Sequence, residues 1–149
     1  MKIAVASDHG GFNLKNKIKQ YLQQKGCEIS DFGTDSTESC DYPDFALPAA
    51  EAVASGKCDR GIIVCTTGIG VSMVANKVPG VRCALCHDAF GAEMTRRHND
   101  ANVLALGEKS VEEGKALEIV DIFLKTVFEG GRHQCRVDKI TAIEKKYCK

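Results

Sequence analysis

The sequence predicts an α/β fold in which helices flank a parallel sheet. Four short apolar runs and a weaker fifth candidate alternate with amphipathic stretches, and this alternation is typical of βαβ units. The chain has 149 residues, a length that fits one domain with its own core. We therefore expect a single domain over residues 1–149, with no linker and no internal repeat.

The strand candidates are the apolar runs at residues 2–6, 62–65, 81–86 and 103–106, with the weaker one at 27–32. A first helix is predicted over residues 12–25. Its buried face is formed by Leu14, Ile18, Tyr21 and Leu22, and Gly26 follows as a C-cap. The lysines on the other positions of this helix, Lys15, Lys17 and Lys19, are expected to face water.

Further helices are predicted over residues 43–53, 70–77 and 89–98. Ser110 and Glu113 have the spacing of a capping box for a long helix that ends at Gly130 and Gly131. Its expected buried stripe consists of Ala116, Val120, Phe123, Leu124 and Val127. A last helix over residues 137–147 has few apolar residues, which suits an arm packed on a partner better than a core element.

Composition excludes several classes of function. Twenty basic and twenty acidic residues balance to a formal charge of zero, which disfavours broad binding to nucleic acid or to an anionic membrane. The amino-terminal segment lacks the features of a signal peptide, and no segment approaches transmembrane length. Eight cysteines are scattered through predicted strands and helices, as expected for reduced thiols. We expect a cytoplasmic protein that binds a small molecule.

The segment from Gly61 to Ser72 is the most informative part of the chain. An apolar strand ends in Cys65, and a glycine-rich turn leads into a helix. Free amides at such a helix start favour a thiolate and bind a phosphate or an enolate oxygen. Cys65 is thus a candidate base or nucleophile, although a small buried core residue is the alternative.

Three other interpretations of cysteine and glycine motifs are weaker. The Gly68-Ile69-Gly70 segment begins a dinucleotide fingerprint, but Met73 stands where the third glycine is required. A thiol phosphatase needs an arginine where the chain has Val71. The Cys83-Ala84-Leu85-Cys86-His87 segment fits haem, redox or zinc spacing, but residues three apart in a strand point to opposite faces.

Several polar residues are candidates at the predicted strand and helix ends. Asp8 and His9 follow the first strand, where they form either a plain turn or part of a site. His98 ends a polar helix, where it either stabilises the helix dipole or acts as a proton shuttle. Arg132 and Arg136 are four residues apart, and on a helix they would share a face and could hold one phosphate.

Taken together, these motifs resemble the ribose-5-phosphate isomerase B enzymes of the ribose/galactose isomerase family. The matching segments extend over essentially the whole chain and are Ser7-Asp8-His9-Gly10-Gly11, Asp41-Tyr42-Pro43-Asp44, Cys65-Thr66-Thr67-Gly68-Ile69-Gly70, Ala75-Asn76-Lys77, Arg97-His98-Asn99-Asp100-Ala101-Asn102-Val103-Leu104 and Gly130-Gly131-Arg132-His133. The family also includes enzymes that act on galactose 6-phosphate and allose 6-phosphate.

The resemblance implies a single-domain Rossmann-like three-layer sandwich, with a parallel five-stranded sheet and a C-terminal helical arm at about residues 130–149. It implies a homodimer with shared active sites, no metal and no cofactor, which interconverts ribose 5-phosphate and ribulose 5-phosphate through an enediolate. Isomerisation of a hexose 6-phosphate is the alternative within the family. A sugar-phosphate-binding protein without catalytic activity is the alternative outside it.

Roles for individual residues also follow from the resemblance. Cys65 would be the base, Thr67 would assist proton transfer, and His98 would open the sugar ring. Thr66 stands where the family commonly has glycine, and Lys109 stands where arginine is familiar. The other residues of the implied substrate-binding set are Asp8, His9, Tyr42, Gly68, Ile69, Gly70, Ser72, Asn99, Arg132 and Arg136.

Overall fold

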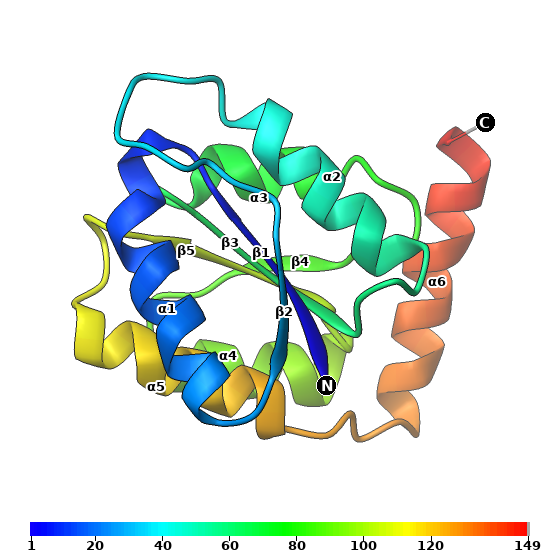
Figure 1. Cartoon of the computed structure of the whole chain (residues 1–149). Helices are drawn as coiled ribbons and strands as arrows, with labels where there is room; N and C mark the ends of the chain where they lie inside the picture. The colour runs from blue at the N-terminus through cyan, green and yellow to red at the C-terminus, as the bar shows by residue number, and fades with distance from the viewer. Residues whose placement is uncertain (149) are drawn as a thin grey trace.

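The computed structural model describes residues 1–148 and contains one parallel sheet, as predicted (Figure 1). The strands are β1 (Lys2–Ser7), β2 (Glu28–Asp31), β3 (Arg60–Cys65), β4 (Cys83–Leu85) and β5 (Val103–Gly107). Their order across the sheet is β2-β1-β3-β5-β4. Because the chain runs from β1 outward to β2 and then returns to β3 on the other side of β1, the sheet is doubly wound.

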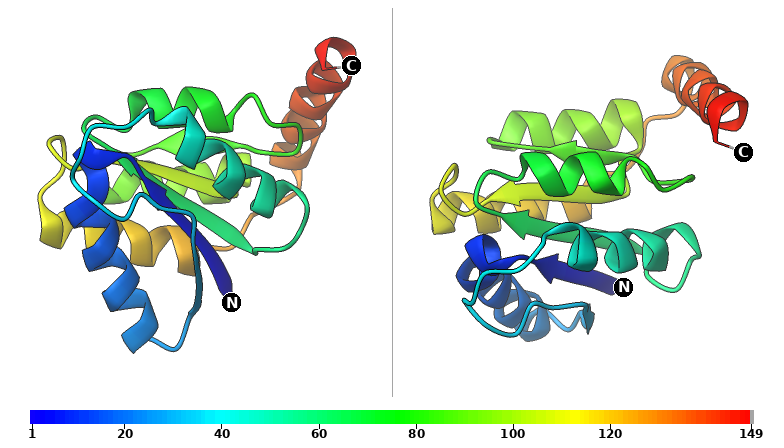
Figure 2. Two further views of the ribbon diagram at one scale, coloured as in Figure 1. Left: turned by 45° about the horizontal axis from the view of Figure 1, so that its top comes forward. Right: turned by 90° about the horizontal axis from the view of Figure 1, so that it is seen from above.

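Helices cover both faces of this sheet, so the chain forms three layers (Figure 2). A short 3-10 helix, η1 (His9–Gly11), leads into α1 (Phe12–Gln24), and the others are α2 (Pro43–Ala54), α3 (Ile69–Ala75), α4 (Ala89–Asn99), α5 (Glu113–Lys125) and α6 (Arg132–Tyr147). Helices α1, α4 and α5 pack on one face, and α2 and α3 pack on the other.

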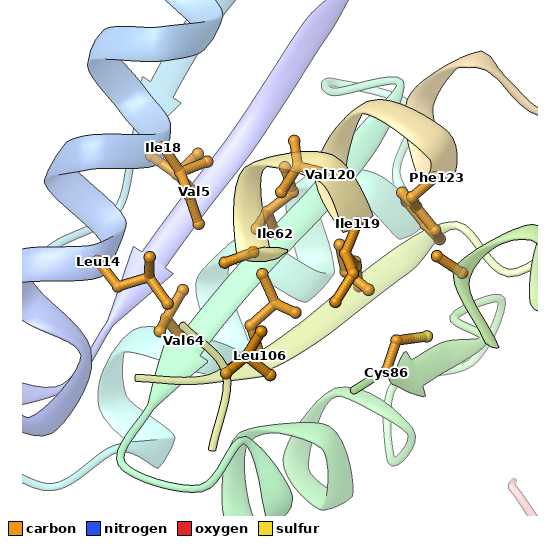
Figure 3. Packing of buried hydrophobic residues seen from close by; sticks show 14 of the residues in the cluster. Val5, Leu14, Ile18, Ile62, Val64, Cys86, Leu106, Ile119, Val120 and Phe123 are labelled. Carbon is orange, nitrogen blue, oxygen red and sulfur yellow. The ribbon is translucent and has the colours of Figure 1, made fainter. Parts of the chain in front are cut away.

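The two faces bury different side chains because consecutive strand residues alternate between them. Ile62 and Val64 pack with Phe123 under α1 and α5 (Figure 3), and burial of each such large side chain contributes roughly 1.5–3 kcal/mol. Ile63 and Cys65 point to the other face, where small alanines of α2 allow the helices to approach closely. Cys65 therefore ends β3 on the α2 and α3 side.

The predicted first helix is confirmed, but Lys15 does not face water. It is 1% exposed, and its Nζ donates to Asp31 Oδ1 at 2.9 Å and to the Thr34 carbonyl at 2.8 Å. Burial alone would raise the pKa of Asp31, but hydrogen bonds from Lys19 and Lys15 outweigh it and lower the pKa. The aliphatic stem of a lysine packs like an apolar residue when its ammonium group finds acceptors.

The prediction of a capping box at Ser110 is wrong. The amides of Ser110 and Val111 both donate to the Gly107 carbonyl, so the chain is still turning there. Glu112 is the N-cap of α5, and its side chain does not cap the helix. The helix ends at Lys125, which leaves Val127 outside it and 78% exposed.

Helix α6 begins at Arg132, earlier than predicted, with Gly131 as its N-cap. It lies beyond the amino-terminal ends of the strands and away from the sheet (Figures 1 and 2). Only His133 and Val137 of this helix are buried, while Ile143 and Tyr147 are 60% and 72% exposed. Within residues 1–148, no helix is both long and apolar enough to cross a membrane.

Candidate active site

The carboxyl-terminal ends of β1, β3 and β5 bring three turns together. The Asp8 amide donates to the Val64 carbonyl, which joins the turn after β1 to β3. The amides of Glu108 and Lys109 donate to the carbonyls of Cys65 and Thr66, at 2.9 and 3.0 Å, and join the turn after β5. Residues that are far apart in the sequence thus line one edge of the sheet, which is where ligands bind in doubly wound folds.

Cys65 lies at the centre of this edge and is 5% exposed. Its Sγ accepts a hydrogen bond of 3.0 Å from the Gly68 amide, which fixes the position of the sulfur at the start of the turn. Gly68 has a φ of 77°, and a Cβ built there would lie 2.5 Å from Leu85 Cδ1. The turn that places the amide over the sulfur therefore requires glycine at residue 68.

The two threonines after Cys65 hold this turn in different ways. Thr67 Oγ1 accepts from the Ile69 amide at 3.2 Å, at the start of α3. Thr66 lies against the neighbouring turn, where a Cβ at Gly10 would overlap Thr66 Oγ1. The absence of a side chain at Gly10 makes room for Thr66, so the turn accommodates a threonine at this position.

Asp8 and His9 have ordered orientations at the end of β1. Asp8 Oδ1 accepts from the amides of Gly10 and Gly11 at 2.9 and 3.1 Å, which caps η1. His9 Nδ1 accepts from the Cys40 amide at 3.2 Å. The proton of a neutral His9 ring must therefore be on Nε2, which leaves an N–H donor for a ligand.

The remaining predicted residues of this edge surround the start of α3. The Tyr42 ring packs against Gly70, where a Cβ would lie 2.8 Å from Tyr42 Cζ. The Ser72 hydroxyl donates to the Ile69 carbonyl at 2.7 Å. Ile69 and Lys109 are exposed beside them. This group, together with the residues described above, forms an open surface with backbone amides, hydroxyls and one thiol.

Four predicted site residues lie at the opposite edge of the sheet, where the strands begin. They are His98, Asn99, Arg132 and Arg136. Helix α4 starts after the carboxyl end of β4 and runs back, so its last turn lies beside the amino-terminal end of β5. The Ala101 amide, just before β5, donates to the Thr95 carbonyl of this turn. Within one chain, the predicted catalytic residues Cys65 and His98 are therefore separated by the length of the sheet.

Comparison with known proteins places this arrangement in a family. The model of the Ribose/Galactose Isomerase family matches residues 3–140. Ribose-5-phosphate isomerase B of Escherichia coli (strain K12) is 48% identical over 145 residues, which cover 97% of each chain. The chain belongs to the Ribose/Galactose Isomerase family.

Two solved structures of family members agree with this assignment. Ribose-5-phosphate isomerase B of Clostridium thermocellum is 59% identical and superposes with a TM-score of 0.98 over 99% of both chains. The enzyme of Mycoplasma genitalium, solved with bound ribulose-5-phosphate, is 45% identical, with a TM-score of 0.93 over 97% of both chains. The family inferred from the sequence motifs is confirmed, and so is the predicted α/β fold. The protein is an isomerase.

Two residues at the second edge of this isomerase, His133 and Glu129, were given no role from the sequence. The His133 ring stacks on His98 with centroids 4.2 Å apart and planes at 11°, and His133 Nε2 lies 3.3 Å from Glu129 Oε2. Burial and the neighbouring His98 and Arg132 lower the pKa of His133. Glu129 and His133 are four residues apart, and this spacing could have indicated that the two side chains meet. The expected helix end at Gly130 lies between them, so the spacing was not interpreted as a contact.

Arg132 and Arg136 share one face of α6, as their spacing predicted, and both are exposed. Asn99 ends α4, and its carbonyl accepts from Arg82 Nε at 3.0 Å. The thiols of Cys83 and Cys86 do face opposite sides of the sheet, as predicted. Burial raises the pKa of Cys86 to about 11, so this cysteine is a neutral thiol at physiological pH.

Proposed function

We propose that the protein interconverts ribose 5-phosphate and ribulose 5-phosphate through an enediolate, with Cys65 as the base. The hydrogen bond from the Gly68 amide to Cys65 Sγ carries this proposal, because it holds the sulfur beside the backbone amides of the turn that follows β3. Support comes from the relatives named ribose-5-phosphate isomerase B and from the one that contains ribulose-5-phosphate.

In this mechanism the Cys65 thiolate removes the C2 proton of the open-chain aldose. The electron pair forms the C1–C2 double bond, and negative charge develops on O1, where the amides of the turn at residues 66–70 stabilise it. The thiol then returns the proton to C1, while the Thr67 hydroxyl relays the O2 proton to O1. The product is the ketose, and no electrons leave the substrate, so the chemistry needs no redox cofactor.

Opening of the furanose ring is assigned to His98. This step protonates the ring oxygen O4, breaks the C1–O4 bond and removes the proton from the C1 hydroxyl. An imidazole exchanges both protons near neutral pH. His98 lies at the other edge of the chain, and a second copy must therefore supply it to the Cys65 edge.

We therefore propose a homodimer in which each active site combines the Cys65 edge of one copy with the His98 edge of the other. Asp8 and Asn99 would hold sugar hydroxyls, and His9, Arg132 and Arg136 would bind the phosphate across the interface. Arginine suits this role because its N–H donors match phosphate oxygens. The exposed apolar residues of α6, such as Ile143 and Tyr147, would be covered by the partner.

Conversion of ribose 5-phosphate is the test, with Cys65→Ala as the variant. Cys58→Ala is a matched control, because Cys58 is 3% exposed in the same core cluster but precedes β3 rather than ending it. We expect Cys65→Ala to lose turnover and Cys58→Ala to keep it. Turnover by Cys65→Ala close to the wild-type rate would refute the proposal.

We place this reaction in the cytoplasm, where cysteines stay reduced. All eight cysteines are free in the structure, and several are only half-buried or exposed. Allose 6-phosphate assayed in parallel at equal concentration distinguishes the pentose from a hexose phosphate as the preferred substrate.

A further inference from the structure

One group of three metal-ligating side chains occurs in the described part of the chain. It consists of His98, Glu129 and His133, whose nearest ligand atoms all lie within 4.8 Å of one another. The three residues come from the end of α4, the segment before α6 and the first turn of α6. Their exposure differs, because His133 is buried, His98 is half-buried and Glu129 is exposed. An ion can therefore reach the group from solvent on the side of Glu129.

The distances within this group suit zinc. His133 Nε2 and Glu129 Oε2 are 3.3 Å apart, and a tetrahedral zinc ion with bonds of about 2.0–2.1 Å separates neighbouring ligand atoms by about 3.3 Å. The ligand atom of His98 lies within 4.8 Å of the other two, and its side chain is half-buried.

A second observation points to a ligand at this place. The His133 side chain is only 5% exposed. Its Nε2 atom is buried and has no hydrogen-bond partner within residues 1–148. The other oxygen of Glu129, Oε1, accepts from Arg97 Nη1 at 3.3 Å. Such an outer contact orients a ligating carboxylate while leaving its second oxygen available for a metal.

We propose that His98, Glu129 and His133 form a binding site for a zinc-type divalent cation that inhibits the enzyme. Two imidazoles and one carboxylate leave the fourth position of a tetrahedral ion open. The cations Arg97, Arg132 and Arg136 nearby oppose binding, so the affinity is lower than that of a structural zinc site.

The inhibitory effect follows from the bonding of His98. A metal on its ring nitrogen occupies the lone pair that accepts the C1 hydroxyl proton, and ring opening stops. This part of the inference rests on the proposed function, whereas binding of the ion does not.

The first test is calorimetric titration of the full-length protein with Zn²⁺. Glu129→Gln removes the carboxylate ligand but keeps an acceptor for Arg97. Glu93→Gln is the matched control, because Glu93 also pairs with Arg97, at 2.8 Å, but is not in the cluster. We expect Glu129→Gln to weaken zinc binding by at least about tenfold, since even outer contacts are worth roughly 10–100-fold.

Titration with Co²⁺ tests whether the metal binds to cysteines instead of the proposed cluster. Bonds between Co²⁺ and thiolates produce an intense near-ultraviolet absorption band. Binding at the proposed cluster gives visible bands without that charge-transfer band, and Glu129→Gln weakens them. Equal zinc affinity in wild type, Glu129→Gln and Glu93→Gln, or a cobalt spectrum with a strong thiolate band at the first equivalent, would overturn the site.

The second test measures inhibition on two reactions. Ribulose 5-phosphate cannot form a furanose, because its O5 carries the phosphate, so deuterium exchange at its C1 needs Cys65 but not ring opening. We expect Zn²⁺ to slow ribose 5-phosphate conversion in wild type and Glu93→Gln, more than it slows C1 exchange. Zinc binding without slower conversion overturns the inhibitory role. If the proposed function is wrong, ribose 5-phosphate is not converted even without zinc, so that outcome is distinguished from a failure of the zinc site.

Discussion

The two edges of the sheet are built in different ways. At the carboxyl edge, backbone groups and glycine turns hold the Cys65 site, as in the contact between the Gly68 amide and the sulfur. At the amino edge, the stacked rings of His98 and His133 form the site with side chains from α4 and α6. Backbone hydrogen bonds between turns that follow the strands hold the first edge, whereas the second is held by side-chain contacts between α4 and α6.

The largest expected effect separates the two edges by chemistry. Cys65→Ala is expected to lower both ribose 5-phosphate conversion and C1 deuterium exchange of ribulose 5-phosphate by roughly 10²–10⁴-fold, the range for a general base. His98→Asn is expected to lower the conversion while C1 exchange continues. Proton NMR in deuterated water measures both reactions. Loss of C1 exchange in His98→Asn would place His98 in the enolisation step.

Mixing the two inactive variants tests whether the edges meet between copies. Random reassortment after dissociation makes half of the dimers heterodimers, and each of these has one site with both Cys65 and His98 intact. We expect about a quarter of wild-type activity to return. Recovery is measured after refolding the mixture, with each variant refolded alone as the control. A mixture as inactive as its components would show that the sites are not shared.

Gly68→Ala tests the backbone character of the carboxyl edge. Alanine at a φ of 77° costs about 1–2 kcal/mol, and its Cβ would also meet Leu85 at 2.5 Å. Gly80→Ala is the control, since Gly80 has a φ of 85° but nothing within 4 Å of its Cβ. Urea unfolding is expected to show a larger stability loss for Gly68→Ala, with loss of activity. Equal losses would mean that the turn accommodates a Cβ.

Lys15→Met tests a support of the carboxyl edge that lies behind the site. Lys15 Nζ bonds to Asp31 and to the Thr34 carbonyl, next to Gly33, whose carbonyl accepts from the Ser7 amide. We expect a stability loss of about 1.5–3 kcal/mol, typical of hydrogen bonds to charged groups. Lys19→Met, at 34% side-chain exposure, is the control and is expected to cost less than about 1 kcal/mol. Similar losses would contradict a special role for Lys15.

The smallest expected effect is the pH dependence of this support. The pKa of Asp31 is lowered in the folded protein, so the carboxylate contributes stability above its unfolded value, near 3.8, and that contribution is lost as pH falls through the folded pKa. Stability measured by urea unfolding between neutral pH and pH 3 is expected to fall less steeply in Lys15→Met. Identical slopes in both proteins would indicate that Asp31 is not coupled to Lys15.

Local sequence was sufficient for the strands and for the core of the first site. A short apolar run bounded by turn residues indicates a buried strand. A cysteine between such a strand and a glycine-rich turn therefore lies at the end of the strand. The opposite orientation of Cys83 and Cys86 follows from strand geometry alone. The family also followed from ordered motifs, because several matches in sequence are more specific than one.

Tertiary structure decided the points that depend on distant partners. Lys15 is buried because Asp31 and the Thr34 carbonyl accept its protons, and no helical period reveals such acceptors. Ser110 is not a cap, because its amide is bound to Gly107. The direction of α4 placed His98 at the far edge from Cys65, beside His133. Sequence periodicity reports which face of an element is buried, whereas the side chains that meet across elements are decided by packing.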